Sequence, residues 1–194
     1  MPRSLILASG SPYRLQLLKE AGYEVTPVAS AIVEPELLVA PDLEEQLLSL
    51  ACAKALTVAD RGFTGLILAA DTVSLVNDEI LGKPTDEADA RRMLTLLVGH
   101  PHEVWTAWVF LRTDRNQKLH GVEKTKLVFR PWKPGELDDY LASGEWAGKC
   151  GAYGLRLPDD PLLTEIIGST SNVIGLPLER FAQLECERPD FFED

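Results

Sequence analysis

The chain has 194 residues, of which 45% are hydrophobic and 25% are charged, and its formal net charge is −11. These values are typical of an ordinary globular protein with enough length for a substantial core, and they disfavour a general nucleic-acid binder, which would present a basic face. No apolar run approaches the ~20 residues that cross a bilayer, and the three cysteines are scattered without metal-ligand spacing. We therefore expect a soluble, cytoplasmic protein that does not bind membranes.

The first half of the chain alternates the hydrophobic patterns of strands and helices. Strands are expected over residues 5–8, 66–70 and 73–76. Helices are expected over residues 12–21, 44–59 and 87–97. Asp71 and Thr72 interrupt the second apolar run, so we expect a break between two strands at that point.

The second half predicts a hairpin, with strands over residues 103–112 and 119–130 around the polar turn TDRNQK. Helices are expected over 135–142 and 178–186, a further strand over GAYGLRL (151–157), and a frayed tail over 188–194. There is no internal repeat or linker-like stretch in the sequence. We expect one domain over residues 1–187, of the α/β class, with a mixed sheet and flanking helices.

The junction between the first strand and the first helix has the residues of an anion site. Ser11 is a good N-cap and Pro12 suits the first helical position, where a helix exposes unpaired N–H groups. Arg14 shares a helix face with Leu17 and Leu18, so it is expected to point inward. A capped surface helix with a snorkelling arginine is an equally good interpretation of this stretch alone, since no Walker or G-x-G-x-x-G pattern is present.

Two more charged residues stand where apolar ones are expected. Lys54 falls on the apolar stripe of the helix over 44–59, so it must either reach an edge or meet an anion. Asp71 follows a wholly apolar run, which predicts a carboxylate at the end of a buried strand, where α/β sheets bind ligands. The alternative for Asp71 is an ordinary turn residue.

Further cations occur beside glycines. Lys83 lies in a Gly-Lys-Pro turn, and Lys149 and Arg156 flank a glycine-rich segment. With the cations described above, they predict a locally positive cleft in an acidic protein, which suits a polyphosphate with its metal ion. Glu34 and Asp71 could hold a magnesium ion, which prefers one or two carboxylates together with substrate phosphates.

His100 and His102 are too few to make a metal site, because no acidic or cysteine partner follows at a useful spacing. We expect a structural or hydrogen-bonding role for these histidines.

Several motifs, in the same order along nearly the whole chain, resemble the Maf-type nucleoside triphosphate pyrophosphatases. They are LASGSPYRLQLL, AADTV, LGKP, GHPHEVWT, GKCGAYGL and VIGLPL. The resemblance implies a fold like that of the inosine triphosphate pyrophosphatases, with two lobes around a deep cleft, and often a homodimer. It also implies hydrolysis of a nucleoside triphosphate to the monophosphate and pyrophosphate, with Mg²⁺ or Mn²⁺ as the metal cofactor.

Carried over by position, the resemblance implies that Asp71 is the general base for the attacking water. Catalytic support is expected from Lys54, Lys83 and Arg14. Glu34 and Asp71 are expected to bind the metal. Substrate binding is expected from Ser9, Ser11, Tyr13, Thr72, Lys149 and Arg156.

Three departures from the family pattern leave the identity of the substrate's nucleotide base open. Tyr13 replaces the first arginine of the S-P-R-R motif, which is similar to the branch that acts on 7-methyl-GTP, where a tryptophan is usual. Thr72 resembles the dTTP/UTP branch instead, yet Arg156 stands where that branch has glutamine. Val33 replaces the aspartate that usually precedes Glu34. A nucleotide-binding regulatory protein without turnover, linked to division arrest, and a phosphatase for a non-nucleotide substrate remain as alternatives.

Overall fold

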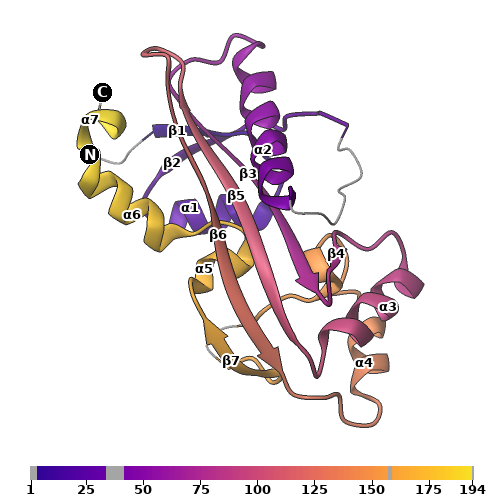
Figure 1. The fold of residues 1–194 in the computed structure, drawn as a ribbon. Helices are drawn as coiled ribbons and strands as arrows, with labels where there is room; N and C mark the ends of the chain where they lie inside the picture. Colours follow the sequence, from indigo (N-terminus) through magenta and orange to yellow (C-terminus); the bar gives the residue numbers. More distant parts are fainter. Residues whose placement is uncertain (1–3, 34–41, 157–158, 194) are drawn as a thin grey trace.

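The structure, a computed structural model, describes residues 4–33, 42–156 and 159–193. Its longest feature is the antiparallel hairpin of β5 (Pro101–Arg112) and β6 (Gln117–Phe129), which extends along the whole molecule in Figure 1. The two strands pair over their full length, from Pro101 opposite Val128 to Arg112 opposite Gln117. This confirms the hairpin expected from the sequence.

Within the described residues the strands form one mixed seven-stranded sheet, in the order β2-β1-β3-β5-β6-β7, with β4 beside β3. The remaining strands are β1 (Ser4–Leu7), β2 (Glu24–Pro27), β3 (Leu66–Val76), β4 (Glu79–Leu81) and β7 (Leu163–Ile167). Strand β1 is parallel to both β2 and β3, and the other pairings are antiparallel. The sequence did not predict β2, β4 or β7.

β3 is one continuous strand, so the expected break at Asp71 and Thr72 is wrong. Asp71 pairs with Ala107 and Thr72 with Thr106 in the ladder with β5, and this ladder holds the polar residues in extended backbone. On its other edge, β3 pairs with β1 only at residues 67–68 and with β4 only from residue 74. Within the described chain, residues 69–73 therefore have no strand partner on that edge, which we call the β3 gap.

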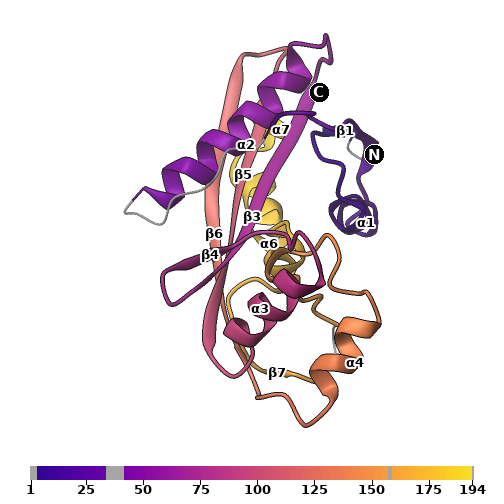
Figure 2. The same cartoon turned by 90° about the vertical axis from the view of Figure 1, so that its right-hand side faces the viewer.

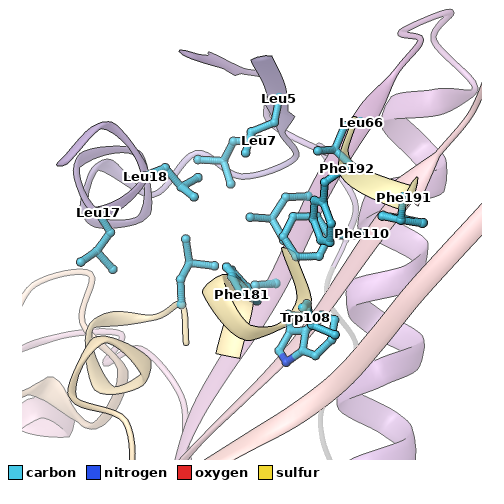
Figure 3. Packing of buried hydrophobic residues seen from close by; sticks show 14 residues of the cluster. Leu5, Leu7, Leu17, Leu18, Leu66, Trp108, Phe110, Phe181, Phe191 and Phe192 are labelled. Atoms are coloured by element: carbon cyan, nitrogen blue, oxygen red, sulfur yellow. The ribbon is translucent and has the colours of Figure 1, made fainter. Parts of the chain in front are cut away.

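Helices cover both faces of the sheet in one lobe. α2 (Leu43–Ala59) packs its apolar stripe on one face, while α1 (Pro12–Glu20) and α6 (Leu178–Glu187) pack on the other. Figure 3 shows the aromatic part of the core beneath α1 and α6. In this core Phe110 contacts Phe181 at 4.8 Å and Phe192 at 5.1 Å between ring centroids.

A second lobe lies toward the other end of the hairpin, where α3 (Glu87–Leu97) and α4 (Glu136–Ala142) are seen in Figures 1 and 2. Its own core joins these helices to Leu81 and Ala152. The short α5 (Thr170–Ile174) connects β7 to the α6 lobe. Throughout the described ranges, no helix combines the length and the apolar character needed to cross a membrane.

Two expectations are corrected here. Residues 151–156 do not form a strand: Cys150–Ala152 is a 3-10 turn, and Gly151 and Ala152 have φ of 65° and 61°, which a strand does not allow. The tail is not frayed over Pro189–Phe192, which forms α7, because Phe191 and Phe192 are only 1% and 3% exposed in the aromatic core.

Candidate active site

A cavity of about 940 Å³ lies at the β3 gap and is lined by residues from both lobes. All predicted site residues except Glu34 line it. They are Ser9, Ser11, Tyr13, Arg14, Lys54, Asp71, Thr72, Lys83, Lys149 and Arg156. Glu34 lies outside the described residues. The expected cleft between two lobes is therefore present.

The junction between β1 and α1 forms one wall of the cavity. Ser11 caps α1, with its Oγ accepting the N–H of Arg14, and Pro12 occupies the first helical position, as predicted. The Oγ of Ser9 accepts the N–H of Ser11 at 3.2 Å, which holds both serines at the opening of the helix. The N-terminus of α1 thus faces the cavity with small hydroxyl side chains around it.

Arg14 points inward, which confirms the helix-face prediction and excludes the snorkelling alternative. Its guanidinium donates to the Oγ of Ser9 at 3.2 Å, the Oγ1 of Thr72 at 2.9 Å and the carbonyl of Gly175 at 3.0 Å. Thr72 also contacts Thr106, with 2.9 Å between the hydroxyl oxygens. These contacts fix the orientation of the Arg14 charge, which suits bidentate recognition of a phosphate.

Lys54 and Asp71 form a buried ion pair on the opposite side of β3. The ammonium nitrogen lies 2.5 Å from Oδ1 of the carboxylate, and the residues are only 6% and 8% exposed. Lys54 therefore meets an anion rather than reaching an edge. Asp71 lies in the middle of β3 and not at its end, but the β3 gap leaves it open to the cavity.

The second lobe contributes a glycine-rich turn. The ammonium of Lys149 lies 5.6 Å from the ring centroid of Tyr13, so a contact crosses the cavity between the lobes. The thiol of Cys150 donates to the carbonyl of Thr72 at 2.8 Å, which anchors the turn at the β3 gap. Gly151 needs its small size, because a Cβ there would lie 2.6 Å from a methyl group of Leu97.

Arg156 lies at the rim of the cavity in an ion pair with Glu145, at 2.5 Å between Nη2 and Oε1. The hydrogen bond from Arg156 is the main cause that lowers the pKa of Glu145, and the same bond raises the pKa of Arg156. The charge of Arg156 is therefore balanced by a partner that the sequence did not predict.

The far end of the cavity is aromatic. The ring of His102 lies 4.9 Å from that of Phe129, which in turn lies 4.7 Å from Tyr153, measured between centroids. The Tyr153 hydroxyl donates to the Asp160 carboxylate at 2.9 Å, and burial raises its pKa strongly. We call the part of the cavity lined by His102, Phe129 and Tyr153 the aromatic chamber. A planar apolar group with few polar atoms fits it.

The described residues contain no group of three or more His, Cys, Asp or Glu side chains that could hold a metal ion by themselves. Among the described residues, the acidic side chains that line the cavity are Asp71, paired with Lys54, and Glu145, paired with Arg156. A metal that binds here would draw ligands from the substrate together with side chains that line the cavity, such as the Asp71 carboxylate.

A family model described as "Maf-like protein" matches residues 4–187. The chain belongs to the Maf-like family. The dTTP/UTP pyrophosphatase of Rhodopirellula baltica is 44% identical over 188 residues, which cover 94% of this chain and 81% of that protein. The dTTP/UTP pyrophosphatase of Geotalea uraniireducens is 39% identical and covers 90% of both chains.

Solved structures resemble this Maf-like chain more distantly. The Staphylococcus aureus Ham1 protein gives a TM-score of 0.46 at 16% identity, over 69% of this chain and 76% of that one. This likeness is too low to support an inference about activity.

The aromatic chamber and Glu145 are the parts of the Maf-like site that the sequence analysis did not predict. The strand GHPHEVWT places His102, Val104 and Thr106 at alternating positions, so they share one face of β5. That alternation could have linked His102 to Thr106, which contacts Thr72 at the β3 gap.

Proposed function

We propose that this Maf-like protein hydrolyses a nucleoside triphosphate to the nucleoside monophosphate and pyrophosphate. The observation that carries the proposal is that one cavity is lined by both the Asp71 carboxylate, which is paired with Lys54, and the fixed Arg14 guanidinium. The pyrophosphatase names of the relatives support the same reaction.

The phosphates bind at the N-terminus of α1, where Ser9, Ser11 and Arg14 donate hydrogen bonds to their oxygens. Lys54 and Lys83 neutralise the charge that develops as the anhydride bond between the α and β phosphates breaks. Asp71 accepts the proton of the attacking water, whose oxygen forms the new bond to phosphorus, and pyrophosphate leaves.

A divalent cation, Mg²⁺ or Mn²⁺, is part of the proposal. Asp71 and Glu34 would hold it together with the substrate phosphates, which fits the preference of Mg²⁺ for one or two carboxylates plus phosphates. When bound, the cation neutralises phosphate charge and orients the triphosphate.

The relatives support dTTP or UTP as the substrate more than 7-methyl-GTP. Tyr13 could stack on a cationic methylated base, but the Lys149 ammonium already lies 5.6 Å from that ring. A second cation on Tyr13 would be repelled by the first. We therefore propose a neutral pyrimidine base. A cytoplasmic location and a homodimer stay predictions.

The experiment is a panel of nucleoside triphosphates with Mg²⁺ or Mn²⁺, in which pyrophosphate and orthophosphate are measured separately. Asp71→Asn should lower kcat by at least about a hundredfold, because it removes the proton acceptor. Asp78→Asn is the matched control, since Asp78 is exposed in a turn.

Two outcomes would overturn the proposal. Nucleotide binding without turnover by the wild-type protein would favour the regulatory alternative. Orthophosphate as the product would favour a phosphatase. Tyr13→Arg tests which nucleotide base the site selects. If Tyr13 contacts the base, the substrate preference of this variant should move further toward pyrimidine triphosphates.

A further inference from the structure

His102 is a polar side chain in the aromatic chamber with one ring nitrogen unused. It is 4% exposed and lines the cavity. Its Nδ1 lies 3.2 Å from the carbonyl oxygen of His100. A carbonyl can only accept, so Nδ1 carries the proton. Within the described parts of the chain, Nε2 has no hydrogen-bond partner.

The imidazole is neutral near pH 7, because burial lowers the pKa of His102. In a neutral imidazole with a proton on Nδ1, Nε2 has a lone pair and accepts hydrogen bonds. Nε2 faces the cavity, so once a bound ligand excludes water from it an acceptor left without a partner is costly, and a ligand group that donates to Nε2 binds favourably.

The chamber is at a suitable distance from the phosphate side. Thr106 contacts Thr72, which binds Arg14, and Thr106 lies four residues from His102 on the same face of β5. At ~3.3 Å per residue, this spacing places the backbone of His102 ~13 Å from the backbone of Thr106. A nucleotide with its phosphates at Arg14 can therefore place its base beside His102, against the contacting rings of Phe129 and Tyr153.

We propose that Nε2 of His102 accepts a hydrogen bond from the ring N–H of the base, which makes the substrates triphosphates whose base carries such a group beside a carbonyl. This inference rests on the proposed function. Uracil, thymine and 7-methylguanine all have this N–H, so the two substrate branches that the sequence left open share it. Cytosine has an unprotonated ring nitrogen at the same position, which places two acceptors opposite each other.

UTP and CTP test the proposal directly, because CTP lacks the ring N–H and carries an amino group in place of the neighbouring carbonyl. The wild-type protein should prefer UTP by about tenfold or more in kcat/KM, the effect of one satisfied against one unsatisfied buried group. His102→Phe keeps a ring against Phe129 but removes the acceptor. It should raise KM for UTP about tenfold, leave CTP nearly unchanged, and bring the UTP:CTP ratio close to one.

Three further measurements separate recognition from folding. His102→Gln supplies a carbonyl oxygen and should restore part of the UTP preference. His120→Phe is the matched control, since His120 is exposed on β6 and does not line the cavity, and its ratio should equal that of the wild type. N3-methyl-UTP lacks the donor and should be a poor substrate of the wild-type protein, which requires no variant.

An unchanged UTP:CTP ratio in folded His102→Phe would overturn the inference, as would equal turnover of UTP and N3-methyl-UTP. In both cases pyrophosphate release would still support the proposed function. Absence of pyrophosphate from every nucleotide would instead overturn the proposed function itself.

Discussion

The Lys54 ammonium reaches from the apolar face of α2 to the Asp71 carboxylate in the middle of β3, at 2.5 Å. The residues are 6% and 8% exposed, so water screens the pair little. The pair stabilises the Asp71 charge, and the loss of Lys54 would leave this carboxylate buried without this partner.

Lys54→Met should lower the free energy of unfolding by about 3–5 kcal/mol, because it leaves the Asp71 charge buried without this partner. Chemical denaturation measures the change, and Lys19→Met, at an exposed position of α1, is the control. The double variant Lys54→Met/Asp71→Leu should recover most of the stability and none of the activity. A single variant as stable as the wild type would contradict the pair's structural importance.

Arg14→Lys should lower kcat/KM by about tenfold or more while the protein stays folded. A lysine keeps the charge but cannot donate to Ser9, Thr72 and Gly175 with the geometry of a guanidinium. Steady-state kinetics with UTP measure the effect. Arg91→Lys is the control, because Arg91 forms an exposed ion pair with Asp138 on the second lobe; equal losses in both variants would argue against a special position for Arg14.

The pH dependence of stability should report the burial of His102. Burial lowers the pKa of His102 below 6.5, so between these values the unfolded chain binds a proton that the folded one does not. Its contribution to stability is complete above about pH 6.5 and is lost as the pH falls through the folded pKa. The neighbouring Tyr153 stays neutral in this range, since its pKa is raised.

The measurement compares unfolding free energies of the wild type and His102→Phe between pH 5 and 7, at about 0.5-unit steps. The wild type should lose up to about 1.4 kcal/mol more per pH unit on acidification. Parallel pH curves for the two proteins would show that His102 is not buried as a neutral group.

Phe191→Ala should destabilise the protein by about 3–5 kcal/mol, since the side chain is 1% exposed and its removal leaves a cavity. Phe63→Ala, at a half-buried position near the surface, should cost less. Thermal unfolding followed by circular dichroism compares them. A small effect of Phe191→Ala would show that the C-terminal segment contributes little to the core.

Helix periodicity in the sequence was sufficient to predict that the side chains of Arg14 and Lys54 point into the protein. Arg14 and Lys54 each fall on an apolar helix face, and both lie in the cavity, because a helix face is fixed by residue spacing alone. The β5–β6 hairpin was predictable for a similar reason, as its strands and turn are local features.

The wrong predictions of a strand break at Asp71 and Thr72 and of a strand over 151–156 have causes in the tertiary structure. Asp71 and Thr72 indicate a strand break locally, but Lys54 and Arg14 bind their side chains and allow the strand to continue. The segment 151–156 has strand-like residues, yet left-handed backbone at Gly151 bends it across the cavity. No local pattern contains those partners, so the sequence alone could not predict them.

The Nε of Arg14 donates to the carbonyl of Gly175, a residue 161 positions away along the chain. The wall of the cavity that contains Arg14 therefore cannot be complete until the C-terminal segment has docked against the N-terminal helix. Contacts between such distant residues form slowly, because a long loop must close first. In refolding experiments, catalytic activity should return no earlier than the tertiary signal of the C-terminal third, so enzyme turnover would serve as a marker that both ends of the chain have assembled.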